Sequence, residues 1–580
     1  MSNWWIRTPA VGGTLSRLRF PAWDFSDRIK LMKLPVRFAC LVLVGCAAFA
    51  ALPLGRFVSA NTGAVSELPT PTPKPMVNPS PRATPIPVPT PSPTPVPVQT
   101  LAELQSKIRS RMLSPDVRRG RVGIKIVSLN SGKVLFENDS EKYFMPASNM
   151  KNFTVATAME RLTPGYKFVT NISSTNAPDA DGLVKGNLKI TGRGDVSLST
   201  TFDPAFPGQI NYYRAIDQLV DKISAAGIKR VEGDLIGDES YFQGFAIPDT
   251  WEWDDLQSYY GTEISALPLN DNVVDIIVRP GSSGGSCSVS VMPATALVRF
   301  ANTCVTKSGP DTVRISKRMN QNMIDVTGSM ASGAKERRES VAFSHVGELF
   351  IDVLRQRLLA RGITVTGQNR VTNIQAEIPC PKCSSVLSIN FGSVESPPFS
   401  VIAAKTMKPS QNMYTETILW TLGEEIGRKN GGSGNSAQLG LGVIKTFLKQ
   451  IGIPDDGIVQ YDGSGLSRHD LITPSAVVTL YSYMAKQSKY SQAWRDSLTI
   501  GGVDGTLKNR FKGTAAQGNI RGKTGTIDQV SALSGYLTTA SGEQIIISIV
   551  VNGVPNQALR TSLIDDIVVN LANFNGKIDQ

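Results

Sequence analysis

A proline-rich stretch divides this chain of 580 residues into two parts of different character. Residues 69–98 contain thirteen prolines, separated mostly by Thr, Ser and Val. Proline has no backbone N–H and a fixed φ, so such a stretch builds neither helix nor sheet and packs no core. It favours extended polyproline II and acts as a semi-rigid spacer, with a passive disordered linker as the alternative. We assign residues 61–100 to this linker and expect the folded part to begin near Leu101.

The residues before the linker have the pattern of an export signal. Residues 1–37 are basic, and an uncharged apolar run of seventeen residues follows from Phe38 to Leu54. This run is at the short edge for a membrane-spanning helix, and its basic flank favours the cytoplasmic side. Residues 1–60 therefore predict either a retained membrane anchor or a signal cleaved near Ala60, with lipidation at Cys46 as a further alternative. Each reading places the rest of the chain outside the cytoplasmic membrane.

The charge distribution and the histidine content argue against some classes of partner and of active site. The net charge is +12, but residues 1–60 carry +6 of it and residues 61–100 another +1. The remaining +5 is spread over residues 101–580, so we do not expect nucleic acid as a partner. The chain has two histidines, His345 and His469, which leaves little material for a Ser-His-Asp triad or a histidine-rich metal site. We predict no metal.

Secondary-structure signals change twice beyond Leu101. Residues 101–113 predict an amphipathic helix, and residues 122–137 predict a β-hairpin around a turn at 130–132. Residues 170–395 are rich in strands, with helices predicted near 212–226 and 345–361. Later signals predict helices at 399–407, 413–427, 437–450, 473–486 and 558–574 and strands at 522–527, 530–538 and 544–551. We expect an α/β domain formed by residues 101–169 and 396–580, interrupted by one or two β-rich subdomains over residues 170–395.

Four cysteines lie in the strand-rich region. Outside the cytoplasm, a disulfide is the default state of such residues. We predict the pairs Cys287–Cys304 and Cys380–Cys383, and the sequence leaves the connectivity open. A four-thiolate zinc site is the alternative, although the region holds a single Cys-x-x-Cys unit.

A motif that indicates a reactive serine beside a lysine follows the predicted hairpin, at Ser148-Asn149-Met150-Lys151. Apolar residues recur at helical spacing from here to Leu162, and Pro146 suits the approach to a helix N-terminus. Ser148 and Lys151 should therefore project from one face of a buried helix. An ammonium beside a hydroxyl in a dry cleft loses proton affinity and can accept the proton of that hydroxyl. A second Ser-x-x-Lys at 332–335 lies in a polar run, and we expect it at the surface.

Two further short patterns complete the signal. Ser410-Gln411-Asn412 lies between two predicted helices, and Lys523-Thr524-Gly525-Thr526 opens a predicted strand. Ser-x-Asn alone means little because the chain contains it also at 128–130 and 388–390, whereas Lys-Thr-Gly occurs once. The three patterns in this order, each in its expected local structure, are typical of acyl-transferring serine enzymes.

With these motifs the chain resembles the penicillin-binding proteins and serine β-lactamases. The closest resemblance is to the class C low-molecular-mass D-alanyl-D-alanine carboxypeptidase/endopeptidase family, peptidase family S13, and it covers roughly residues 101–575. The supporting stretches are 192–195, Trp251 and Trp253 with Asn270, 461–468, and 505–507 with Arg510. The resemblance implies a β-lactamase/transpeptidase-like α/β fold. In this fold an antiparallel sheet flanked by helices contains strands from both chain ends, with the Ser148 helix on its face.

The resemblance also implies catalytic roles. Ser148 would attack the carbonyl between two D-alanines and form an acyl-enzyme, while Lys151 takes the serine proton. Ser410, with Lys523 nearby, would relay that proton to the departing D-alanine. Water would then hydrolyse the ester, and no cofactor is required.

Substrate-binding roles follow from the same resemblance. Asn412 would hydrogen-bond the substrate backbone and Lys151, and Lys523 with Thr524 would bind the terminal carboxylate. The backbone N–H groups of Ser148 and Thr526 would form the oxyanion hole.

The implied partners are peptidoglycan stem peptides, β-lactam antibiotics as covalent inhibitors, and the cytoplasmic membrane through the N-terminal segment. Asp238 and Phe242 are implied contacts of the stem peptide. The implied location is the bacterial cell envelope, on the periplasmic or extracytoplasmic side. Alternatives are a serine β-lactamase or esterase of the same fold and a non-catalytic wall-binding homologue. The balance of carboxypeptidase and endopeptidase activity stays open.

Overall fold

The structure, a computed structural model, describes residues 97–372 and 388–578. The predicted anchor or signal, the cleavage and lipidation positions and nearly all of the linker lie outside the described residues, as does the Cys380–Cys383 pair. Within the two described ranges, no helix is both long and apolar enough to cross a membrane.

A six-stranded antiparallel sheet joins the two ends of the folded part. Strand β1 from the N-terminal hairpin pairs along its whole length with β24, one of the last strands. This arrangement confirms the prediction that strands from both ends share one sheet. In order across the sheet, the strands are β2 (Val134–Asn138), β1 (Arg121–Ser128), β24 (Gln544–Asn552), β23 (Val530–Thr538), β22 (Arg521–Ile527) and β21 (Thr499–Ile500).

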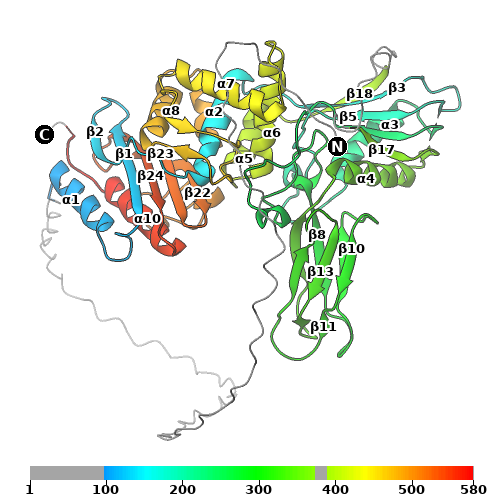
Figure 1. Ribbon diagram of the computed structural model, residues 1–580, viewed down its shortest axis with the longest axis horizontal. Helices are drawn as coiled ribbons and strands as arrows, with labels where there is room; N and C mark the ends of the chain where they lie inside the picture. The colour runs from blue at the N-terminus through cyan, green and yellow to red at the C-terminus, as the bar shows by residue number, and fades with distance from the viewer. Residues whose placement is uncertain (1–96, 373–387, 579–580) are drawn as a thin grey trace, which may run out of the picture. The chain divides into compact units, whose positions relative to one another are not determined.

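Helices cover both faces of this sheet, so its central strands β23 and β24 are buried on both sides. On one face, Ile545 and Ile547 of β24 pack in the cluster formed with helices α1 (Leu101–Met112) and α10 (Gln557–Ala572), which Figure 1 shows beside these strands. On the other face, Ile546 and Val550 join a second cluster. The helices that contribute to it are α2 (Lys151–Arg161), α5 (Phe399–Met407), α6 (Asn412–Leu422), α7 (Ser436–Gln450), α8 (Pro474–Lys486) and α9 (Ser491–Ser497).

Most predicted helices in this part are confirmed to within one or two residues. The predicted helix 413–427 consists of α6 and a short π-helix, Gly423–Arg428. Helix α9 and the small pair β19 (Ile458–Val459) and β20 (Leu471–Ile472) were not predicted, since each is too short to show a periodic pattern.

Residues between β3 and β18 form their own set of sheets around a hydrophobic cluster whose members all lie within residues 172–394. Both predicted helices are present, α3 (Arg214–Ala225) and α4 (Val346–Ala360). A five-stranded sheet has the order β17 (Asn369–Thr372), β7 (Leu235–Asp238), β5 (Leu188–Thr191), β3 (Val169–Ser174) and β18 (Ile389–Glu395). A first three-stranded sheet has the order β16 (Thr364–Val365), β6 (Arg230–Val231), β4 (Leu183–Val184), and a second has the order β15 (Arg337–Ala342), β8 (Val273–Arg279), β9 (Ser288–Met292). A third has the order β10 (Arg299–Asn302), β13 (Met323–Thr327), β12 (Arg314–Lys317). Strands β11 (Val305–Thr306) and β14 (Ser329–Met330) form a two-stranded sheet.

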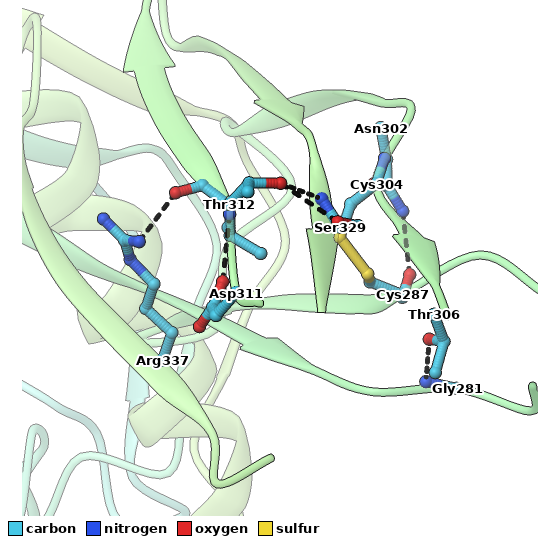
Figure 2. The surroundings of a disulfide bond; sticks show 10 residues. Gly281, Cys287, Asn302, Cys304, Thr306, Asp311, Thr312, Ser329 and Arg337 are labelled. Carbon is cyan, nitrogen blue, oxygen red and sulfur yellow. Dashed lines mark hydrogen bonds between the residues drawn. A yellow bond between two sulfur atoms is a disulfide. The ribbon is translucent and has the colours of Figure 1, made fainter. Parts of the chain in front are cut away.

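A disulfide joins Cys287 and Cys304 in this region, with Cα atoms 5.3 Å apart, which confirms that predicted pair. Both cysteines are buried. Figure 2 shows the bond and the adjacent contact in which the Asn302 side-chain amide donates to the Cys287 carbonyl at 2.8 Å. The disulfide takes up two of the four thiolates that the zinc alternative requires.

We expect the double variant C287S/C304S to weaken the inserted region. The bond closes a loop with a sequence separation of 17. Opening a loop of that size costs roughly 3 kcal/mol because the unfolded chain gains freedom. Urea unfolding of the variant, compared with wild-type protein with and without reductant, measures the loss. Equal unfolding midpoints for oxidised wild type and variant would contradict the expectation.

Candidate active site

Ser148 lies in a tight turn that precedes α2. Residues Ala147–Met150 form a 3-10 turn, and the α-helix begins at Lys151, whereas the sequence predicted a helix from Ser148 onward. Ala147 has a φ of 47°, in the left-handed region that residues with a side chain seldom adopt. The Asn149 side-chain amide ties this turn to β22 by donating to the Lys523 carbonyl at 3.1 Å.

Two glycines let other segments press against the turn. A Cβ added to Gly525 of β22 would lie 2.5 Å from the Pro146 carbonyl oxygen. A Cβ added to Gly465, which has a φ of +80°, would lie 1.9 Å from the Ala147 carbonyl oxygen. Both distances are shorter than any real contact, so the position of Ser148 depends on the absence of these side chains.

Lys151 is fully buried, and its ammonium has three acceptors from three separate segments. Nζ lies 2.9 Å from Ser148 Oγ, 2.6 Å from Asn412 Oδ1 and 2.8 Å from the Ser464 carbonyl oxygen. Burial lowers the pKa of Lys151 to about 7, although three nearby carboxyl groups, of Asp462, Glu416 and Asp470, oppose this. Near neutral pH much of Lys151 is therefore a neutral amine in contact with the serine hydroxyl.

Lys523 approaches the same place from β22. Its Nζ lies 2.8 Å from Ser410 Oγ and 2.8 Å from the Thr524 carbonyl oxygen. Burial, with the charge of Lys151 nearby, holds the pKa of Lys523 well below its ordinary value. Ser410 has a φ of 68°, which again is unusual for a residue other than glycine. The Thr524 hydroxyl is hydrogen-bonded to Thr506 Oγ1 at 2.7 Å.

The inserted region supplies one wall of the site. Asn412, whose Oδ1 binds Lys151, donates from Nδ2 to the Tyr260 carbonyl oxygen at 3.0 Å. The Trp251 indole N–H donates to Asp462 Oδ2 at 2.9 Å. Residues of this region therefore form hydrogen bonds to Asn412 and Asp462 of the site, in addition to forming their own sheets.

A cavity of about 740 Å³ opens in front of these side chains. Predicted site residues line it from three segments: Ser148, Ser410, Asn412, Thr524 and Thr526. The two predicted lysines, Lys151 and Lys523, are fully buried beside them. The structure thus brings together all seven of the predicted site residues.

Other wall residues were not predicted. They include Glu252, Asp254 and Asp255 of the inserted region. The only signal in the sequence was the run of acidic residues between Trp251 and Leu256, and such a run more often lies in solvent. Thr506, the partner of Thr524, lies in the stretch 505–507 that supports the family resemblance, but it was not predicted as a site residue.

Two weaker expectations concern residues away from the lining of this cavity. Asp238 forms an ion pair with Lys189 at 2.5 Å, and neither Asp238 nor Phe242 is among the residues that line the cavity. The second Ser-x-x-Lys lies at the surface as predicted, with Ser332 and Lys335 exposed.

Comparison with known proteins agrees with this geometry. The model of the D-Ala-D-Ala carboxypeptidase 3 (S13) family matches residues 104–574. The chain belongs to this family. A D-alanyl-D-alanine carboxypeptidase from an Actinomadura species is 31% identical over 489 residues, which cover 82% of this chain and 86% of that protein. The D-alanyl-D-alanine carboxypeptidase DacB of Haemophilus influenzae is 24% identical over 437 residues, 74% of this chain and 85% of that protein.

Solved structures show the same fold as this carboxypeptidase-family chain. Penicillin-binding protein 4 of Haemophilus influenzae matches with a TM-score of 0.66 at 22% identity, covering 83% of this chain and 100% of that one. A second structure of that protein, in complex with a β-lactam, matches with a TM-score of 0.62 at 21% identity. The predicted β-lactamase/transpeptidase-like fold is confirmed.

Replacing Gly525 by alanine should displace β22 from the Ser148 turn. The added methyl group would meet the Pro146 carbonyl at 2.5 Å, so the strand and the turn must separate. A shift of this kind costs on the order of 10- to 100-fold in the acylation rate of Ser148, because the reacting groups lose alignment. Acylation by a fluorescent penicillin measures it.

Gly442→Ala is the matched control, because a Cβ at Gly442 in α7 meets no atom within 4 Å. We expect wild-type acylation for G442A. Wild-type acylation for G525A would contradict the steric argument.

Proposed function

We propose that this S13-family chain hydrolyses the D-Ala-D-Ala bond of peptidoglycan stem peptides through an acyl-enzyme on Ser148. The observation that carries the proposal is the 2.9 Å contact between Nζ of the fully buried Lys151 and Oγ of Ser148, which lines the cavity. Neither a free serine nor a solvated lysine is reactive at neutral pH, whereas a desolvated lysine with a pKa of about 7 can act as a base.

In the acylation step, Lys151 takes the Ser148 proton while Oγ bonds to the carbonyl carbon. The negative charge that develops on the carbonyl oxygen requires donors, and we assign the backbone N–H groups of Ser148 and Thr526 to this role. Strand β21 pairs only with Arg521 and Gly522 of β22. Among the described residues, the remaining edge of β22 beside Thr526 has no strand partner, which supports its use as a binding edge for the substrate backbone.

The leaving group and its carboxylate are assigned to the second lysine. Ser410 and Lys523 relay the proton to the departing D-alanine, and Lys523 with Thr524 binds the terminal carboxylate. An arriving carboxylate favours the charged form of a buried lysine, so substrate binding should raise the pKa of Lys523. Water then hydrolyses the ester, and the same lysines return the protons. A β-lactam acylates Ser148 because its amide takes the place of the peptide bond.

We also propose the domain organisation and location inferred from the sequence. Residues 101–169 and 396–580 form the catalytic domain, and residues 170–395 form the insertion, which the separate hydrophobic cluster supports. Residues 1–60 export or anchor the chain, and residues 61–100 tether it on the outer side of the cytoplasmic membrane. Mass spectrometry of the protein from a membrane fraction tests this through the mature N-terminus.

We expect Ser148→Ala to abolish covalent labelling by a fluorescent penicillin and release of D-alanine from a pentapeptide ending in D-Ala-D-Ala. The variant removes only the attacking oxygen. Ser332→Ala, in the exposed second copy of the motif, is the control and should behave as wild type. Labelling that persists in S148A would refute the assigned nucleophile.

The same labelling separates the alternative functions. A stable adduct on wild-type protein with D-alanine release supports the peptidase, whereas rapid turnover of the penicillin identifies a β-lactamase. A properly folded wild type without labelling or D-alanine release identifies a non-catalytic homologue.

The acylation rate should depend on pH through Lys151. Only the neutral amine accepts the serine proton, and burial sets the pKa of Lys151 at about 7. The rate is therefore low at pH 5, rises through about pH 7 and levels off above it. A stopped-flow profile from pH 5 to pH 9 measures the midpoint. A profile that is flat between pH 5 and pH 8 would show that Lys151 is not the base.

A further inference from the structure

Glu416 is a buried acid that the mechanism above does not use. It lies on α6, one turn after Asn412, so both side chains leave the same face of the helix. Its side chain is completely buried. Burying a carboxyl group is costly unless its oxygens are hydrogen-bonded, so the contacts of Glu416 show what it does for the fold.

Those contacts are backbone N–H groups of the 462–467 loop. Gly463 N donates to both carboxyl oxygens, at 3.0 and 2.9 Å, and Ser464 N donates to Oε1 at 2.7 Å. Both oxygens of Glu416 therefore act as acceptors. Burial and the charge of Asp462 raise the pKa of Glu416 to about 8, whereas the hydrogen bonds from Ser464 and Gly463 and the charge of Lys151 lower it. A protonated carboxyl would set an O–H against an N–H, so the hydrogen bonds and a charged Lys151 together favour the carboxylate.

The segment held by Glu416 also binds the catalytic lysine. The Ser464 carbonyl accepts from Lys151 Nζ at 2.8 Å. The Gly463 carbonyl accepts from Thr154 Oγ1 at 2.8 Å, and the Gly465 N–H donates to Asp462 Oδ1 at 2.6 Å. Without the carboxylate, two buried N–H groups lose their partner, and the carbonyl that holds Lys151 loses its support.

Charges around Lys151 make the contribution of Glu416 electrostatic as well. The ionisable groups that face Lys151 are Glu416 on α6, Asp462 and Asp470 on the loop, and Lys523 on β22. Burial and the charge of the neighbouring Asp462 raise the pKa of Asp470 well above its ordinary value. The charges of Asp462 and Glu416 both favour the charged form of Lys151. Of these two carboxyl groups, that of Glu416 is the one that also accepts from the Gly463 and Ser464 N–H groups.

We propose that Glu416 is a positioning residue for the base Lys151. It fixes the Gly463–Ser464 segment whose carbonyl holds Nζ, and its charge stabilises the ammonium that forms when the Ser148 proton moves to Lys151. The inference rests on the proposed function, since it assigns Glu416 a part in the acylation of Ser148.

Two variants separate the effect of the charge of Glu416 from the effect of its side-chain length. Glu416→Gln keeps the size and removes the charge. Glu416→Asp keeps the charge and shortens the side chain by one methylene group. Glu424→Gln is the matched control: Glu424 follows α6, is also buried, and accepts from Ser436 Oγ at 2.5 Å and Arg428 Nε at 2.6 Å. Each protein is compared with wild type in the rate of penicillin acylation from pH 5 to pH 9 and in thermal unfolding.

For E416Q we expect the acid limb of the profile to move to lower pH by about one unit, because an opposite charge no longer favours the ammonium. Its plateau should fall about tenfold, since Lys151 is a weaker and less well-held base. For E416D we expect the limb to stay in place while the plateau falls. E424Q should keep both the limb and the plateau of wild type.

Other outcomes overturn the inference. An E416Q profile that is lower at every pH with an unmoved limb would show that Glu416 only maintains the fold. A wild-type profile for E416Q, or the same changes in E424Q, would show that Glu416 has no particular relation to Lys151. The proposed function fails separately, if wild-type protein itself is not acylated at Ser148.

Discussion

The structure depends on keeping water away from one amine. A lysine in water holds its proton up to a pH near 10.4 and is no base toward serine, whereas Lys151 is fully buried and its pKa falls to about 7. A buried ammonium must have hydrogen-bond acceptors, and the three acceptors of Lys151 come from the Ser148 turn, from α6 and from the 462–467 loop. The need to satisfy one desolvated group therefore brings together segments that lie more than 300 positions apart in the chain.

The six-stranded sheet provides the fixed frame for this convergence. The hairpin of β1 and β2 leads into the Ser148 turn, β1 pairs with β24, and β22 carries Lys523 in the same sheet, so hydrogen-bond register sets the distance between Ser148 and Lys523. Because the register is fixed at the sheet, the residues between α2 and α5 do not disturb it. These residues also contact the site, since the Tyr260 carbonyl binds Asn412 and the Trp251 indole binds Asp462.

The elements and side chains that could be predicted from the sequence are those with a local sequence pattern. The strands β22, β23 and β24 and the helices α5, α7 and α8 have clear apolar periodicity, and the reacting side chains lie in three short motifs, so both were predictable. Main-chain acceptors such as the Ser464 carbonyl carry no signal, because any residue supplies a carbonyl. The left-handed φ values of Ala147 and Ser410 were equally hidden, since neither residue type favours that conformation. Glu416 was invisible because a glutamate in a helix is ordinarily exposed.

The same residue type is given two roles by its surroundings. Lys151 and Lys523 are both fully buried, and the charge of Lys151 lowers the pKa of Lys523. Carboxyl groups face Lys151 and oppose the lowering of its pKa by burial. Burial and the charge of Lys151 dominate at Lys523 and hold its pKa well below its ordinary value, and its Nζ is hydrogen-bonded to Ser410 Oγ. In the proposed function, the carboxylate of the substrate would supply the opposite charge to Lys523. The uneven placement of three acids, which face Lys151, therefore gives the two buried lysines different surroundings and, in that proposal, different roles.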